Sequence, residues 1–286
     1  MPFVLNVIAD DAAKLADEMR GLGEASWLAR GQAFDIAVAG DGAKALKDAR
    51  TIAGSRAADI NLVATERRRK KLLIADMDST IIGCECLDEL ADMAGLKPQV
   101  AAITERAMKG EIEFAPALRE RVGLLKGLPL SALQRVYDER VRLNPGARTL
   151  VGTMRAHGAK TLLVSGGFTF FTQRVAAAAG FQSQQANVLL DDGAKLLGVV
   201  AEPILGREAK LAALEDATLA ARLDLADTLA VGDGANDLAM IGRAGLGVAY
   251  HAKPIVAQAA SASIAQSDLT ALLYLQGFRE EEIVAA

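Results

Sequence analysis

The chain has 286 residues, 51% of them hydrophobic, which is enough for about two globular domains with buried cores. A formal net charge of −4 gives no electrostatic reason to expect nucleic acid or a membrane as a partner. The apolar run at residues 3–8 lacks a basic flank and is not typical of a signal peptide. Two cysteines only one residue apart, Cys84 and Cys86, argue against a disulfide-stapled secreted fold. We therefore expect a cytoplasmic protein.

Residues 1–65 carry the pattern of a small α+β domain. Apolar runs fall at residues 3–8, 24–30, 34–39 and 58–64, with helical patterns at 10–21 and 42–54. The order strand, helix, strand, strand, helix, strand predicts a ferredoxin-like fold. Such a module resembles the ACT-like regulatory domains found on enzymes of amino-acid metabolism.

A basic run, ERRRKK at residues 66–71, follows this module. Clustered cations can form a nucleic-acid patch. Because a buried strand follows at once, we instead expect a solvated linker.

From residue 72 to 286 the pattern is that of an α/β core. Aliphatic runs fall at 71–76, 160–165, 228–233 and 246–250, with helical patterns at 146–157, 168–180, 207–222 and 235–243. Runs without polar alternation are typical of parallel strands buried on both faces, which predicts a doubly wound sheet. The turn DDGAK predicts an antiparallel hairpin near 187–200. Residues 84–143 show only helical patterns and are interpreted as an inserted cap.

Polar side chains end three of the predicted core strands: Asp76, Ser165 and Asp233. In open α/β sheets the ligand crevice lies beyond the carboxyl ends of the strands, so we expect these residues to meet there. Asp78 and Asp237 are close by in sequence and raise the number of carboxylates to four. Carboxylates so close together repel one another, so such a site must either recruit a cation or take up protons. An all-oxygen site beside an open crevice is typical of Mg²⁺.

Two glycine-rich segments favour phosphate as the ligand of this crevice. SGGF, from Ser165, places a hydroxyl and the side-chain-free amide of Gly166 at a predicted helix N-terminus, where backbone N–H groups favour an anion. GDGAND, at 232–237, is a strand-to-helix turn with two acids. Lys210 is a candidate cation for the charge of a transferring phosphoryl group.

In this order, DMDST at 76–80, SGG, a later lysine and GDGAND resemble the haloacid dehalogenase-like phosphotransferases. The resemblance implies that Asp76 is the nucleophile, which forms an aspartyl-phosphate, and that Asp78 is the general acid and base. It implies that the phosphoryl group is bound by Ser165, Gly166 and Lys210. It also implies a Mg²⁺ site formed by Asp76, the backbone carbonyl of Asp78, Asp233 and Asp237.

Two further segments, DMDSTIIGCE at 76–85 and residues 107–128, resemble the phosphoserine phosphatase family. The resemblance implies that Glu85 faces a substrate ammonium and that Arg121 pairs with a substrate carboxylate. It also implies a pocket formed with Met108, Phe114 and Asn236. Independently, an arginine fork suits a carboxylate and a glutamate suits an ammonium.

The resulting hypothesis is a Mg²⁺-dependent phosphatase that hydrolyses O-phosphoserine, in serine biosynthesis, with no nucleic-acid or membrane partner. Two alternatives stay open. One is a related enzyme acting on phosphothreonine or phosphohomoserine, and the other is a binding protein with an inactive core. Loss of Asp76 or Asp233 would mark the second alternative, and neither is lost. The oligomeric state is open, and a homodimer is compatible with the sequence.

Overall fold

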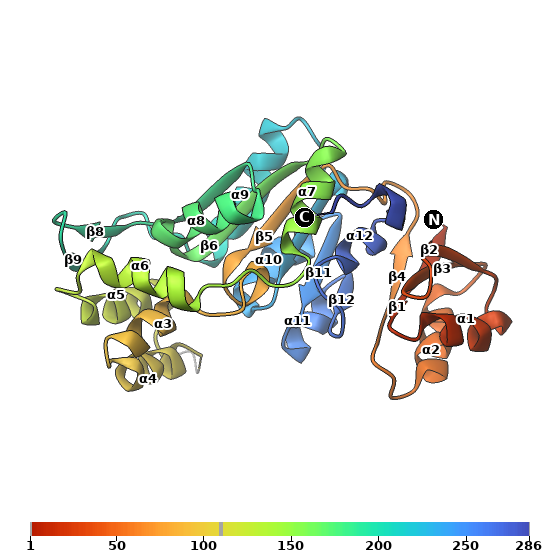
Figure 1. Cartoon of the computed structure of the whole chain (residues 1–286), viewed down its shortest axis with the longest axis horizontal. Coiled ribbons are helices and arrows are strands. Elements are labelled where there is room, and N and C mark those ends of the chain that lie inside the picture. Colours follow the sequence, from red (N-terminus) through yellow and green to blue (C-terminus); the bar gives the residue numbers. More distant parts are fainter. Residues whose placement is uncertain (1, 109–110, 286) are drawn as a thin grey trace.

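The computed structural model describes residues 2–108 and 111–285, without the side chain of Met108. Figure 1 shows three parts in a row: a helical cap at one end, a parallel sheet in the middle and the N-terminal sheet at the other end. Within the described residues, no helix is long and apolar enough to cross a membrane.

The middle part is a parallel sheet with the strand order β12-β11-β10-β5-β6-β7. Its strands are β5 (Leu72–Asp76), β6 (Lys160–Phe168), β7 (Ser183–Asn187), β10 (Thr228–Gly232), β11 (Leu246–Tyr250) and β12 (Ala262–Ile264). The four strands predicted from aliphatic runs are confirmed. The edge strands β7 and β12 were not predicted, because β7 is mostly polar and β12 has only three residues.

Helices cover both faces of this sheet, as predicted for a doubly wound fold. One face packs against α7 (Ala147–Ala156), α8 (Thr169–Ala179) and α12 (Ala271–Leu275), and the other against α9 (Arg207–Ala220) and α10 (Leu238–Arg243). A further helix, α11 (Pro254–Ala259), packs beside α10. Successive residues of a strand point to opposite faces, so Leu73 and Ile74 of β5 enter different cores.

The cap consists of helices that follow β5 in the chain and of a hairpin that comes much later. Its helices are α3 (Cys86–Met93), α4 (Lys97–Met108), α5 (Phe114–Leu124) and α6 (Leu130–Arg140). The predicted antiparallel hairpin is present as β8 (Leu189–Asp191) and β9 (Leu196–Val200). Backbone hydrogen bonds join it to the α5–α6 loop, with Gly127 N–H donating to Leu196 O at 2.8 Å. The cap boundaries at residues 84 and 143 stay predictions.

The N-terminal part is an antiparallel sheet with the order β2-β3-β1-β4. Its elements are β1 (Phe3–Ala9), α1 (Ala12–Glu18), β2 (Ala25–Ala29), β3 (Ala33–Val38), α2 (Gly42–Ala53) and β4 (Ala58–Ala64). The element order and this pairing agree with the predicted ferredoxin-like fold. Helices α1 and α2 cover one face, while Val4 and Val63 on the other face join the main core. The ACT-like resemblance and the domain limits stay predictions.

The basic run at 66–71 makes more contacts with the rest of the chain than a solvated linker would make. The two terminal guanidinium nitrogens of Arg68 donate to the carboxylate of Asp35, at 2.5 and 2.9 Å, and the Arg68 side chain is only 12% exposed. The expectation of a solvated linker is therefore wrong for Arg68. Arg68 packs between the N-terminal sheet and a helix of the core, and no local sequence pattern predicts these contacts.

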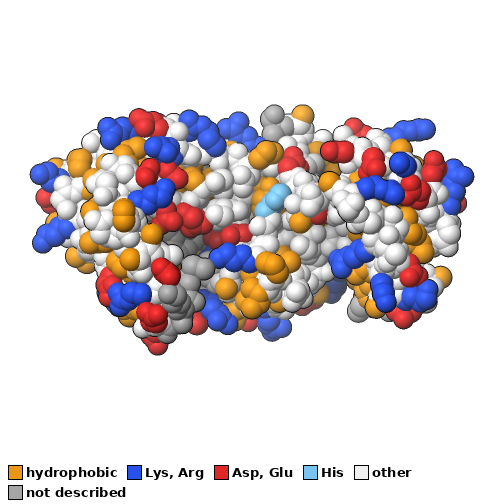
Figure 2. All heavy atoms as spheres, turned by 90° about the horizontal axis from the view of Figure 1, so that it is seen from below, with side chains coloured by type: hydrophobic (Ala, Val, Ile, Leu, Met, Phe, Trp, Pro, Cys, Tyr) orange, Lys and Arg blue, Asp and Glu red, His pale blue; other side chains and the backbone are white. Residues whose placement is uncertain are grey.

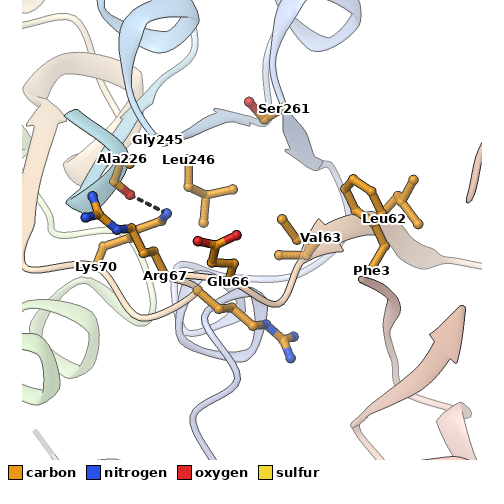
Figure 3. A pocket seen from close by; sticks show the side chains of 12 residues that line it. Phe3, Leu62, Val63, Glu66, Arg67, Lys70, Ala226, Gly245, Leu246 and Ser261 are labelled. Atoms are coloured by element: carbon orange, nitrogen blue, oxygen red, sulfur yellow. Dashed lines mark hydrogen bonds between the residues drawn. The ribbon is translucent and has the colours of Figure 1, made fainter. Parts of the chain in front are cut away.

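The other cations of this run also have partners within the chain. Arg67 binds Asp224 at 2.7 Å, and Arg69 binds Glu282 at 2.6 Å. A cavity of about 540 Å³ lies beside the run, and the Lys70 ammonium donates to Ala226 O at 2.8 Å. Figure 3 shows the side chains that line this cavity, with this hydrogen bond dashed. The three arginines of the run are thus each paired with an acid of this chain, while the absence of a nucleic-acid partner stays a prediction.

Candidate active site

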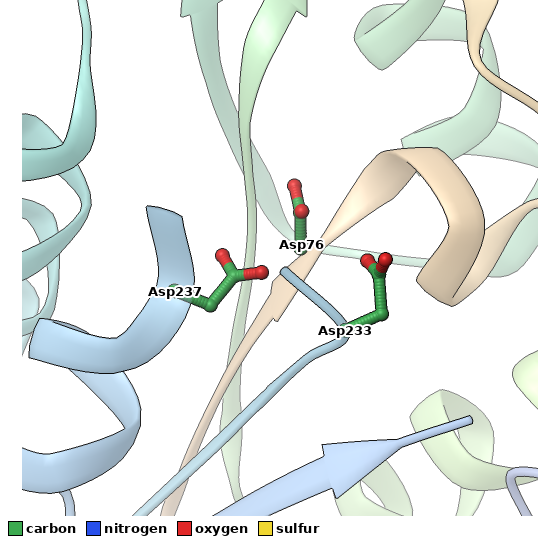
Figure 4. Close-up of side chains that lie close together, drawn as sticks. All are labelled: Asp76, Asp233 and Asp237. Carbon is green, nitrogen blue, oxygen red and sulfur yellow. The ribbon is translucent and has the colours of Figure 1, made fainter. Parts of the chain in front are cut away.

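Three carboxylates converge at the carboxyl edge of the parallel sheet. Asp76 ends β5, Asp233 follows β10, and Asp237 ends the short helical turn Ala235–Asp237. One carboxylate oxygen from each residue lies within 4.8 Å of the others, and Figure 4 shows the three side chains close together at the end of the sheet. Asp76 and Asp237 are buried. A set of anionic oxygen donors in this arrangement fits Mg²⁺.

Lys210 is buried against this cluster. Its ammonium, on the first turn of α9, lies 2.7 Å from a carboxylate oxygen of both Asp76 and Asp237. Burial by itself lowers the pKa of Lys210, but the two carboxylates outweigh burial and hold that pKa above its usual value. Burial and Asp237 raise the pKa of Asp76 although Lys210 opposes them. One ammonium therefore does not neutralise the site, and a further cation is favoured.

Asp78 lies on the same edge with both carboxylate oxygens bound. The Cys86 N–H donates to one oxygen at 2.9 Å, and the Ser165 hydroxyl donates to the other at 3.2 Å. Burial, followed by the charge of Glu85, raises the pKa of Asp78 to about 6. A carboxyl group with such a pKa exchanges a proton near neutral pH, as a general acid and base must.

An irregular turn, Met77–Ile81, carries the chain from β5 toward the cap, and its side chains bind two acids of the site. Ser79 adopts a left-handed φ of 55°, which is uncommon outside glycine. Its hydroxyl donates to Glu85 at 2.6 Å, and the Thr80 hydroxyl donates to Asp233 at 3.1 Å. Sequence reasoning assigned no role to Ser79 or Thr80, although both belong to the DMDST motif.

A cavity of about 150 Å³ lies between these core groups and the cap. It brings together most of the predicted site residues: Asp76, Asp78, Ser165, Gly166, Asp233 and Asn236 from the core, and Glu85, Phe114 and Arg121 from the cap side. Lys210 and Asp237 do not line this cavity, but the Lys210 ammonium directly contacts Asp76, which does. The side chain of Met108 lies outside the described part of the chain. Figure 2 shows acidic side chains gathered in a hollow between the cap side and the middle of the molecule.

Phe114 of the cap lies close to two glycines of the core loops. A Cβ atom added to Gly166 would lie 3.2 Å from the Phe114 ring, and one added to Gly206 would lie 3.1 Å from it. Glycine at both positions therefore lets the Phe114 ring lie against the core loops. Burial lowers the pKa of Arg121, and the charges of Asp88 and Glu85 partly offset this effect. The described side-chain hydrogen bond of Arg121 goes to the Ala117 carbonyl, at 3.3 Å.

Comparison with known proteins agrees with this geometry. Residues 73–242 match the model of the haloacid dehalogenase-like hydrolases. A phosphoserine phosphatase of Polaromonas sp. is 48% identical over 210 residues, which are 72% of this chain and 89% of that protein. A phosphoserine phosphatase of Streptomyces coelicolor is 41% identical over 257 residues, 89% of this chain and 62% of that protein.

A solved structure extends the likeness to nearly the whole chain. The unliganded probable phosphoserine phosphatase of Vibrio cholerae superposes with a TM-score of 0.81 and 31% identity, over 98% of this chain and 88% of that one. The chain therefore belongs to the haloacid dehalogenase-like hydrolase family, and the Polaromonas and Streptomyces relatives named above are phosphoserine phosphatases.

Proposed function

We propose that the protein is a Mg²⁺-dependent phosphatase that hydrolyses O-phosphoserine to serine and phosphate. The observation that carries the proposal is the composition of the small cavity. Its core wall offers Asp76, Asp78 and Ser165 to a phosphoryl group, and its cap side offers Glu85 and Arg121. The names of the relatives favour the same substrate.

The charges on the cap side match those of a free amino acid. The Arg121 guanidinium would bind the substrate carboxylate through paired hydrogen bonds, and Glu85 would bind the ammonium. Ser79 holds Glu85 through its hydroxyl. A cavity of about 150 Å³ admits only a small substrate, so a phosphorylated protein side chain would not fit without opening of the cap.

In the first chemical step, a carboxylate oxygen of Asp76 would attack phosphorus. The bond from phosphorus to the serine oxygen breaks, and protonated Asp78 gives its proton to that oxygen. The products are serine and an aspartyl-phosphate on Asp76. Lys210, Ser165 and the Gly166 amide would bind the phosphoryl oxygens, and Lys210 also favours the ionised form of Asp76.

In the second step, Asp78, now ionised, would take a proton from water as the water oxygen attacks phosphorus. The bond from phosphorus to Asp76 breaks, and phosphate leaves with Asp76 regenerated. A Mg²⁺ ion held by Asp76, the Asp78 carbonyl, Asp233 and Asp237 would supply charge neutralisation for the phosphoryl group.

The direct test measures phosphate release from L-phosphoserine, L-phosphothreonine and an aryl phosphate, each with Mg²⁺ and with EDTA. We expect a strong preference for phosphoserine that EDTA abolishes. Equal rates on the three substrates would remove the assignment of Glu85 and Arg121 while leaving the phosphatase chemistry. Absence of any metal-dependent release would refute the proposed function.

A further inference from the structure

The side chain of Asn187, at the end of β7, links two loops of the active site. It is 2% exposed, and its amide is fully used. The amide nitrogen donates to Gly166 O at 2.8 Å and to Leu205 O at 3.1 Å, while the amide oxygen accepts the Leu205 N–H at 2.7 Å. Asn187 itself is not in the wall of the catalytic cavity.

The bond to Gly166 fixes a peptide group whose other side faces the catalytic residues. That peptide unit joins the Gly166 carbonyl to the Gly167 N–H, and the N–H donates to the Ser165 hydroxyl at 2.8 Å. In a planar trans peptide, C=O and N–H point in opposite directions. Holding the carbonyl at Asn187 therefore directs the N–H toward Ser165 and, through it, toward Asp78.

The two bonds to Leu205 fix the second loop. The next residue, Gly206, is the N-cap of α9, and Lys210 lies on the first turn of this helix. Buried backbone groups of a loop need partners, and an asparagine amide offers a donor and an acceptor together. One side chain thus sets the spacing between the loop of Ser165 and the helix of Lys210.

We propose that Asn187 is a positioning residue for phosphoryl binding, acting through the Gly166–Gly167 peptide and the start of α9. The inference rests on the proposed phosphatase function. Loss of the Asn187 side chain would misplace the residues that bind the phosphoryl group without removing any of them. It should therefore weaken the handling of every phosphate ester and of free phosphate alike.

The test compares Asn187→Asp with a matched control, Asn61→Asp. Aspartate keeps the shape and the acceptor oxygen of Asn187 but places a second oxygen against two carbonyls. Asn61 is also buried, at 3% exposure, and its amide likewise binds both backbone groups of one residue, Ser263, at 3.0 and 2.8 Å. It lies in β4, in the N-terminal sheet. Both changes cost buried hydrogen bonds, but only one touches the active-site loops.

For Asn187→Asp we expect kcat/KM to fall by about 10- to 100-fold on phosphoserine and on an aryl phosphate alike. The inhibition constant of inorganic phosphate should rise in parallel. Asn61→Asp should lower the melting temperature but leave kcat/KM and phosphate inhibition at wild-type values. If Asn187→Asp is not recovered folded, the same measurements are made on Asn187→Ala, which adds no repulsive oxygen.

An Asn187 variant that loses only thermal stability, as the control does, would overturn the proposal. So would a loss confined to phosphoserine, because positioning of the phosphoryl ligands affects both substrates. Failure of the proposed function is a separate outcome, since it shows as a wild-type protein that releases no phosphate.

Discussion

Lys210 at the active site and Arg68 beside the N-terminal sheet both contact buried carboxylates, but their charge balances differ. Lys210 contacts Asp76 and Asp237, each at 2.7 Å, and Asp233 completes the cluster, so three acids face one cation. Burial and Asp237 also raise the pKa of Asp233, to about 6. Such an excess of buried negative charge costs stability until a cation joins it.

Arg68 instead has a balanced set of partners. Asp35 supplies one negative charge, and the Tyr274 carbonyl accepts from both Arg68 and Asn6, at 3.1 Å in each case. This set joins β1 and β3 to α12, which packs on the catalytic core. Because the charges of Arg68 and Asp35 balance, this pair needs no ligand. It stabilises one arrangement of the N-terminal sheet relative to the catalytic core. The imbalance at Lys210, rather than burial as such, identifies the functional site.

The largest effect is expected when the unbalanced cluster loses its nucleophile. Asp76→Asn should reduce turnover of phosphoserine by about 10⁴-fold or more, because an amide does not form the covalent intermediate. The melting temperature without Mg²⁺ should not fall, because one of the repelling carboxylates is removed. Steady-state kinetics measure the turnover, and thermal melts without Mg²⁺ measure the melting temperature. Turnover retained by a pure, metal-replete sample would show that Asp76 is not the nucleophile.

The balanced pair should respond in the opposite way. Arg68→Ala leaves Asp35 buried without its cation and should lower the free energy of unfolding by about 3 kcal/mol. The kcat of the folded protein should be unchanged, because Arg68 does not line the catalytic cavity. Urea unfolding measures the loss. The control is Arg20→Ala, whose exposed pair with Asp17 should contribute less than about 1 kcal/mol. A large loss of kcat at full folding would contradict a purely structural role.

The two charge clusters also differ in how well they could be predicted from the sequence. The acids at the active site follow aliphatic strands, and parallel topology brings such strand ends together, so Asp76 and Asp233 were predictable. Asp35 lies in β3 and Arg68 lies 33 residues later, in the loop between β4 and β5, and neither has a local pattern that marks a partner.

Asn187 was missed for a similar reason. Its strand, SQQAN, lacks the aliphatic pattern that identified the other core strands, and two of its three hydrogen bonds go to a loop beyond the hairpin. The hairpin itself was predicted from its turn, but its backbone pairing with Gly127 depends on tertiary contacts alone. The sequence patterns therefore indicated the acids that meet at the sheet edge, but not the residues that hold the neighbouring loops in place.

Metal binding should remove the imbalance and stabilise the protein. With Mg²⁺ at about 100 times its dissociation constant, the free energy of unfolding should rise by about 2.7 kcal/mol. Thermal melts over a Mg²⁺ series measure this rise, and EDTA should reverse it. Asp233→Asn removes one of the three carboxylates and should shift the series to higher Mg²⁺. A melting temperature that does not depend on Mg²⁺ would argue against the metal site.

The smallest effect concerns Arg121, a half-buried cation whose charge partners are Asp88 and Glu85 until a substrate carboxylate arrives. Arg121→Ala should raise KM for phosphoserine by about 30-fold, equivalent to about 2 kcal/mol for a charged hydrogen-bonded pair. An aryl phosphate has no carboxylate to lose, so its KM should hardly change. Arg119→Ala, on the same helix but bound to the exposed Glu202, is the matched control and should leave both KM values unchanged. If Arg121→Ala affected both substrates equally, Arg121 would act on the shape of the cap rather than on the carboxylate, and selection for phosphoserine would then rest on Glu85 and the dimensions of the cavity.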